Sequence, residues 1–273
     1  LAHPNIVPVY DYVEDQGLCL IVMESLPGGT VWDRFRGAGL SMPEACAIVE
    51  ATCAGLQHAH DKRVLHRDVK PDNLLFDAED TVKVADFGIA TVLGGEETLA
   101  TLDGEVLGTP AYMAPEQALG EPVGPGADVY AAGTMLYELL SGRLPFSEEG
   151  GAVALLQRRV HDAPAPLEAV APAVPPGLAA VVMRALDREP SRRFPRADEL
   201  GAAIAAAAAE AWGPAWRSGT IATSAAPAPA EVGEAGSSST TDDVAEAAGR
   251  RAPVGPGDGG AAAGGRGGPR GGG

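Results

Sequence analysis

Residues 126–140 (GADVYAAGTMLYELL) carry apolar side chains almost all the way round a helix and stop at Ser141-Gly142. A helix without a polar face needs other apolar elements on every side. The segment therefore predicts the buried centre of a large helical domain. The chain can build one, since 45% of its 273 residues are hydrophobic.

The chain before this segment begins with β-rich runs and then becomes helical. Residues 5–15 and 18–24 are typical of two strands joined by a turn at Asp15-Gln16-Gly17. Residues 43–61 have helical spacing, with a capping box formed by Ser41 and Glu44. The other predicted elements are a hairpin within 76–88 and helices at 150–160, 177–186 and 196–211. This order predicts an α+β chain in which a small sheet leads into a helical body.

Composition changes near Gly213, after which Gly, Ala, Ser, Pro and Thr dominate. Such a segment buries too little apolar surface to offset its ordering entropy, so residues 213–273 are predicted to be a disordered tail. The Arg-Gly pieces at its end would also allow a weak RNA contact, although a flexible linker or extension is favoured.

The net charge of −17 belongs almost entirely to residues 1–212, since the tail holds six acidic and five basic residues. Such a charge argues against nucleic-acid or anionic-membrane partners. No membrane segment is expected, because no run of 18 apolar residues occurs. Together with Cys19, Cys46 and Cys53, interpreted as buried free thiols, this predicts a cytoplasmic protein.

Residues 64–76 (VLHRDVKPDNLLF) concentrate charged and polar side chains between two apolar runs. Asp86-Phe87-Gly88 comes thirteen residues after Asn73, and Ala114-Pro115-Glu116 comes further on. In this order and spacing, the motifs resemble the eukaryotic-type protein kinase family over roughly residues 1–211. Lys70, two residues after Asp68, resembles the serine/threonine branch, and the Gly, Ala and Arg bias suggests a bacterial source.

The resemblance implies an ATP-dependent phosphoryl transfer to Ser or Thr of proteins. Asp68 would accept or orient the proton of the acceptor hydroxyl, and Lys70 would neutralise the moving phosphoryl group. Asn73 and Asp86 would hold Mg²⁺ or Mn²⁺ through oxygen ligands. Thr109 would contact Asp68 and the acceptor.

The resemblance also implies an adenine pocket at the connection between two lobes. Met23 would lie at its back and Leu75 would form its floor, although each taken alone could equally be plain core. The backbone groups of Glu24 and Leu26 would bond the adenine edge.

Three further residues are implied to have structural roles. Glu116 and Arg193 resemble a buried ion pair inside the large lobe. Asp128 resembles the carboxylate at a helix start that supports the catalytic loop from below.

Regulation is implied at the segment between Gly88 and Thr109. Arg67 is of the type that pairs with a phosphate on this segment. We expect Thr101 to be the phosphoacceptor, with a fixed negative charge from Asp103, while a solvated threonine without a role is the alternative. Autophosphorylation and dimerisation would accompany this form of regulation.

The family's Gly-rich loop and strand lysine do not occur in this sequence, which has no lysine before Lys62. Residues 1–212 are therefore expected to be a kinase domain that lacks most of its small lobe. Residues 1–27 would keep its strands 4 and 5 and the lobe connection, and residues 28–212 would form the large lobe.

Two functional hypotheses remain for such a chain. A catalytic fragment, weak in ATP binding and inactive by itself, is favoured because Asp68, Lys70, Asn73 and Asp86 are all present. The alternative is a kinase-like scaffold that works without catalysis and uses an exposed apolar edge to bind its partner.

Overall fold

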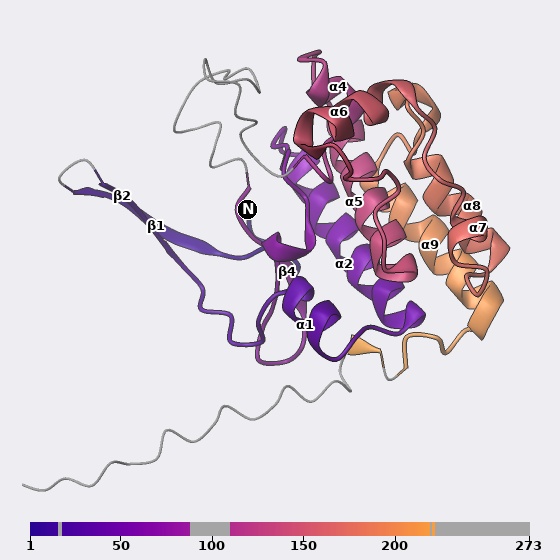
Figure 1. Ribbon diagram of the computed structural model, residues 1–273. Helices are drawn as coiled ribbons and strands as arrows, with labels where there is room; N and C mark the ends of the chain where they lie inside the picture. The colour runs from indigo at the N-terminus through magenta and orange to yellow at the C-terminus, as the bar shows by residue number, and fades with distance from the viewer. Residues whose placement is uncertain (16–17, 88–109, 219, 222–273) are drawn as a thin grey trace, which may run out of the picture. The chain divides into compact units, whose positions relative to one another are not determined.

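In the computed structural model, the apolar segment is helix α5 (Pro125–Ser141), in which residues 127–140 are all buried. The helix ends at Gly142, whose φ of +72° suits a residue without a Cβ. Helix α5 packs against α2 (Met42–His60), α8 (Pro176–Ala185) and α9 (Ala197–Trp212). Figure 1 shows these four helices together in the helical body. The predicted buried centre is confirmed.

The structure describes residues 1–15, 18–87, 110–218 and 220–221. The shorter helices of the body are α1 (Val31–Gly37), α4 (Pro115–Ala118), α6 (Gly151–His161) and α7 (Leu167–Val170), with single 3-10 turns at Pro71–Asn73 and Pro190–Arg192. The capping box at the start of α2 is present, since Ser41 and Glu44 exchange hydrogen bonds. The predicted α+β class is confirmed.

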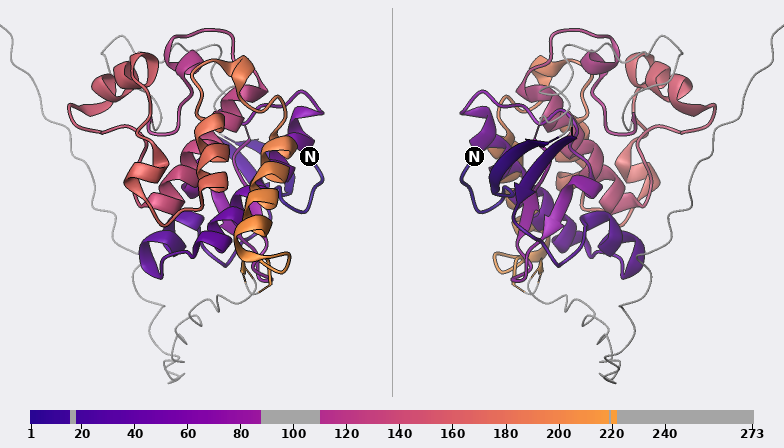
Figure 2. Two further views of the ribbon diagram at one scale, coloured as in Figure 1. Left: turned by 90° about the vertical axis from the view of Figure 1, so that its right-hand side faces the viewer. Right: turned by 90° about the vertical axis from the view of Figure 1, so that its left-hand side faces the viewer.

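Two small antiparallel sheets accompany the helices. Strands β1 (Val9–Asp15) and β2 (Leu18–Met23) form one hairpin, with Val13 opposite Leu20. Strands β3 (Leu74–Phe76) and β4 (Val82–Val84) form the other, with Leu75 opposite Lys83. Figure 1 shows the β1–β2 hairpin leaving the helical body near β4, and Figure 2 shows the same hairpin in front of the helices when that side faces the viewer.

The β1–β2 hairpin exposes apolar side chains on both of its faces. Those that are at least 38% exposed are Val9, Tyr10, Tyr12, Val13, Leu18, Leu20, Val22 and Met23. A two-stranded hairpin is only marginally stable by itself in water. Its attachment to the helical body therefore matters for the site below.

The N-terminal segment makes this attachment. The Asn5 side chain donates to the carbonyl of Val82 at 2.9 Å, and Val7 N donates to the carbonyl of Val84 at 2.9 Å. On its other side the segment lies against α2 at Gly55, where a Cβ would come within 2.6 Å of the Asn5 carbonyl oxygen. A glycine at this position lets the segment wedge between β4 and α2.

The predicted boundary at Gly213 needs a correction. Trp216, after the end of α9, is 5% exposed and belongs to the core, and Arg217 forms an ion pair with Glu50 of α2 at 2.6 Å. The packed part of the chain therefore extends beyond Gly213, because one aromatic residue and one arginine anchor the segment. Composition averaged over the tail hides them. The rest of the predicted tail, from residue 222 onward, lies outside the described residues.

Within the described ranges, no helix combines the length and the apolar character that crossing a membrane requires.

Candidate active site

The loop between α2 and β3 is held from below by Asp128, in the first turn of α5. Its two carboxylate oxygens accept hydrogen bonds from the backbone N–H groups of His66 at 2.9 Å and Arg67 at 2.8 Å. A third donor, His60 Nε2 of α2, lies 2.7 Å from the same carboxylate. Arg67 has a φ of +67°, which is uncommon for a residue with a side chain. The bonds to Asp128 stabilise this turn of the backbone.

The ring of His66 holds the backbone N–H of Asp68 in place through a hydrogen bond. His66 is 1% exposed, and its Nδ1 accepts from Asp68 N at 3.2 Å. Its Nε2 donates to the carbonyl of Ala85 at 2.8 Å, so the neutral ring carries its hydrogen on Nε2. The ring of Phe87 lies 4.9 Å from the His66 ring. The loop is thereby tied to the segment that follows β4.

The Asp68 carboxylate lies between two donors. Asp68 Oδ2 accepts from Lys70 Nζ at 2.7 Å and from Asn73 Nδ2 at 3.1 Å. Asn73 Nδ2 also donates to the backbone carbonyl of Asp68 at 2.8 Å, so the amide oxygen of Asn73 is directed elsewhere. The Asp68 side chain is 48% exposed. The solvent-accessible carboxylate of Asp68 is thus held in place with the ammonium group of Lys70 beside it.

The pairing of β3 with β4 brings the backbone just before Asp86 next to Asn73. Ala85 N donates to the Asn73 carbonyl at 2.8 Å, one step beyond the pair Leu74 and Val84. Asp86 itself is exposed and has a φ of +56°.

The oxygens of Asn73 and Asp86 have the chemistry that a hard divalent cation prefers. Mg²⁺ usually takes only one or two protein ligands and keeps several waters. Two oxygen-bearing side chains therefore fit such an ion. Within the described ranges, no group of three or more His, Cys, Asp or Glu side chains has the arrangement of a metal site.

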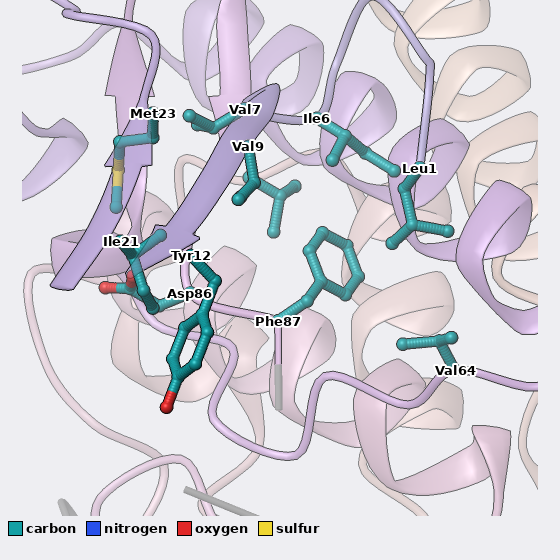
Figure 3. Close-up of a pocket in the computed structure, with 11 residues that line it drawn as sticks. Leu1, Ile6, Val7, Val9, Tyr12, Ile21, Met23, Val64, Asp86 and Phe87 are labelled. Atoms are coloured by element: carbon teal, nitrogen blue, oxygen red, sulfur yellow. The ribbon is translucent and has the colours of Figure 1, made fainter. Parts of the chain in front are cut away.

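A cavity of about 320 Å³ opens between the β1–β2 hairpin and the helical body (Figure 3). Its lining is mostly apolar, and Figure 3 shows the Phe87 ring pointing into it, with Asp86 on the side of Met23 and Ile21. The residues that line it are Leu1, Ile6, Val7, Val9, Tyr12, Ile21, Met23, Val64, Val84, Asp86 and Phe87.

The structure places one of the residues predicted to surround adenine in the lining of this cavity and the other three outside it. Met23 lines the cavity, whereas Glu24, Leu26 and Leu75 are not part of its lining. The Glu24 carboxylate instead forms an ion pair with Lys83 of β4 at 2.7 Å, and Leu75 lies opposite Lys83 in the β3–β4 ladder. Lys83 was not among the predicted site residues. The sequence pattern that could have indicated Lys83 is its position as the one polar residue between two valines of the VKV strand.

Glu116 and Arg193 lie together in the interior. The two guanidinium nitrogens of Arg193 donate to the two carboxylate oxygens of Glu116, at 2.7 and 2.8 Å. Arg193 also donates to the backbone carbonyls of Gly126, Asp187 and Arg188. The side chain of Arg193 is 0% exposed. It therefore joins α4 to the start of α5 and to the segment before α9.

The segment before α4, residues 111–114, is anchored by side chains that sequence analysis did not identify. Arg159 of α6 donates to the carbonyls of Ala111 and Met113. Burial lowers the pKa of the Arg159 guanidinium below its ordinary value. Tyr112 donates to Glu138 of α5 at 2.5 Å. Burial raises the pKa of the Glu138 carboxyl, although this hydrogen bond acts in the opposite direction.

His60 and Gln117 were also missed. His60 occurs in the sequence His58-Ala-His60, near the end of α2. Gln117 follows Glu116 directly, and its side chain donates to the backbone carbonyl of Arg67 at 3.0 Å. Because their partners lie 68 and 50 residues away, no local pattern indicates either contact.

Two predicted residues cannot be placed with the others. Thr101 and Thr109 lie outside the described residues. Arg67, predicted to pair with a phosphate on that segment, is exposed.

Comparison with known proteins agrees with the motifs. The family model of the protein kinase domain matches residues 1–200. The chain is 37% identical over 205 residues to serine/threonine-protein kinase PrkC of Bacillus subtilis, covering 75% of this chain and 31% of that protein. It is 39% identical over 207 residues to serine/threonine-protein kinase PknB of Mycolicibacterium smegmatis, covering 74% and 33%.

A third relative, serine/threonine-protein kinase Pkn1 of Myxococcus xanthus, is 38% identical over 198 residues, covering 71% of this chain and 28% of that protein. The chain thus spans about a third of the length of these curated relatives. The predicted resemblance and the kinase-like fold are confirmed. The chain belongs to the protein kinase family and is similar to its bacterial serine/threonine members.

Proposed function

We propose that this protein transfers the γ-phosphoryl group of ATP to serine or threonine hydroxyls of other proteins. One observation carries the proposal: the Asp68 carboxylate is held between Lys70 and Asn73, beside the segment that bears Asp86. Phosphoryl transfer depends mainly on positioning and charge neutralisation, which such a set can supply.

Each residue of this set has a distinct task in the proposed reaction. Asp68 accepts the proton of the acceptor hydroxyl, and its exposure leaves it accessible to a protein substrate. Lys70, at hydrogen-bond distance from Asp68, offsets negative charge on the transferred group. Asn73 and Asp86 hold Mg²⁺ or Mn²⁺, which would neutralise charge on the nucleotide's phosphates.

The remaining assignments concern the nucleotide and regulation. Met23, with Glu24, Leu26 and Leu75, contributes to the adenine site in this proposal. Arg67 binds a phosphate carried by Thr101, and Thr109 contacts the acceptor. The names of the relatives and the position of Lys70 favour Ser and Thr over Tyr as acceptors.

The 273 residues by themselves are proposed to bind ATP weakly and to be close to inactive. No lysine precedes Lys62, so no cation from the β1–β2 hairpin can contact the phosphates. The exposed apolar side chains of this hairpin favour a second candidate, a scaffold that binds a partner without catalysis. A scaffold would keep its partner when Asp68 is replaced.

The reaction can be tested with radiolabelled ATP, Mg²⁺ and a mixed protein substrate. We expect slow incorporation into phosphoserine and phosphothreonine, reduced to background by EDTA and by Asp68→Asn. Asp162→Asn, which changes an exposed aspartate of the helical body, should leave the incorporation unchanged. Phosphotyrosine, or equal incorporation by the Asp68→Asn variant, would contradict the proposal.

The metal site can be tested without turnover. Mn²⁺ should selectively broaden the amide NMR signals of Asn73, Asp86 and their neighbours in the ¹⁵N-labelled protein. Asp86→Asn should weaken Mn²⁺ binding by roughly ten-fold or more, since a unit charge beside a divalent ion is worth at least about 1.4 kcal/mol at this exposure. Broadening that is the same in Asp86→Asn and Asp162→Asn would remove Asp86 from the metal site.

A further inference from the structure

The geometry points to Gln117 as a positioning residue that connects the segment before α4 to the peptide unit preceding Asp68. The inference rests on the proposed role of Asp68 in phosphoryl transfer. Gln117 touches neither Asp68 nor a reacting atom, so its effect on the carboxylate is exerted through the backbone.

The peptide unit between Arg67 and Asp68 is held at both of its ends. Its carbonyl, on Arg67, accepts from Gln117 Nε2 at 3.0 Å. Its N–H, on Asp68, donates to His66 Nδ1 at 3.2 Å. The orientation of this peptide plane determines the φ angle of Asp68 and hence the direction of its side chain. Gln117 therefore provides a contact that orients the Asp68 carboxylate from the backbone side.

The same amide group holds the segment before α4. Gln117 Oε1 accepts from Ala114 N at 3.0 Å, while Nε2 donates to Arg67. An acceptor and a donor are both required, which Glu and Met cannot provide together. The neighbouring residue, Glu116, is anchored by the buried Arg193. The amide of Gln117 thus projects from a firmly held turn and joins two segments 47 to 50 residues apart in the sequence.

This arrangement couples the two segments. A displacement of Ala114 shifts the Gln117 amide and removes support from the Arg67 carbonyl. The hydrogen bond from Asp68 N to His66 Nδ1 then breaks more often, and the Asp68 carboxylate loses its defined direction. Residues 111–113, just before Ala114, are held by Arg159, which donates to the backbone, and by the bond from the Tyr112 hydroxyl to Glu138. A change in this segment can therefore reach Asp68 through one side chain.

Two variants of the full 273-residue protein distinguish the two hydrogen bonds of the Gln117 amide, and a third serves as a control. Gln117→Met removes both hydrogen bonds at similar size. Gln117→Glu keeps the acceptor for Ala114 N but loses the donor to Arg67. Gln157→Met makes the same change as the first variant at an exposed position of α6, which serves as the matched control.

The readout is amide hydrogen exchange of Asp68 and Ala114, with the ¹⁵N shift of the His66 ring. For Gln117→Met we expect both amides to exchange about 3- to 10-fold faster, as the loss of one ordinary hydrogen bond allows. For Gln117→Glu, only Asp68 should exchange faster, and the His66 Nδ1 shift should move towards that of a ring nitrogen without a hydrogen bond. Gln157→Met should match the unmodified protein at all three positions.

Unchanged exchange at Asp68 in both Gln117 variants would overturn the inference, as would an equal increase over all of α5, which would indicate general destabilisation. Neither result depends on turnover, so failure of the proposed kinase activity would be seen separately, in the phosphate-transfer assay. In an assay with measurable turnover, Gln117→Met should lower kcat by more than it raises KM, because substrate contacts are kept while Asp68 is misdirected. A change in KM alone would contradict the positioning role.

Discussion

Replacement of Arg193 by alanine is expected to lower the free energy of unfolding by about 3–5 kcal/mol, the cost of breaking a buried ion pair on one side. The Glu116 carboxylate would remain in the interior without its two guanidinium bonds. The carbonyls of Gly126, Asp187 and Arg188 would lose a donor at the same time. The effect should be large because the side chain of Arg193 is fully buried.

Urea unfolding followed by circular dichroism measures this loss. Arg192→Ala, which removes the neighbouring and exposed arginine, is the control and should change the free energy of unfolding by less than about 0.5 kcal/mol. The double variant Glu116→Gln with Arg193→Met should be more stable than Arg193→Ala, since no unpaired charge stays buried. Equal stability of Arg193→Ala and Arg192→Ala would show that the pair contributes little.

Asp128→Ala is expected to cost roughly 2–5 kcal/mol, since hydrogen bonds to a charged group are each worth about 1.5–3 kcal/mol. The N–H groups of His66 and Arg67 and the ring of His60 would all lose their acceptor. Arg67 would also lose support for its left-handed backbone conformation. The loop that carries Asp68 should therefore loosen together with the fold.

The loss of stability is again measured in urea, and the loosening by amide exchange at His66 and Arg67. Asp128→Asn should fall between the parent and Asp128→Ala, because the amide keeps one acceptor oxygen but turns a donor towards the remaining N–H. Asp162→Ala, at an exposed site, is the control and should be neutral. Fast exchange at these two amides in the unmodified protein would contradict the supporting role of Asp128.

Much of the fold followed from short-range patterns. The apolar segment of α5, the capping box of α2 and the two hairpins all depend on residues a few positions apart, and each appears in the structure. The family also followed from the sequence, because its motifs occur in order along the chain. Periodicity and local turn chemistry act over one or two turns, so they can be recognised without knowing the fold.

Contacts between residues far apart in the sequence were harder to predict. Lys83 binds Glu24 across 59 residues, and the two ends of the Gln117 amide bind partners on different segments. Trp216 joins the core from a stretch whose average composition predicts disorder. A single polar or aromatic side chain forms no periodic sequence pattern, so its role is recognised only from its partner in the tertiary structure.

The sequence by itself determined the buried helix at the centre of this protein, the family, and the set of Asp68, Lys70, Asn73 and Asp86. The tertiary structure alone decided how these side chains are oriented, since that depends on the peptide units around Asp68. Those units are held by Asp128, His66 and Gln117. The bonds of Asp128 and Gln117 join the loop to α5 and α4, so they require the packed fold.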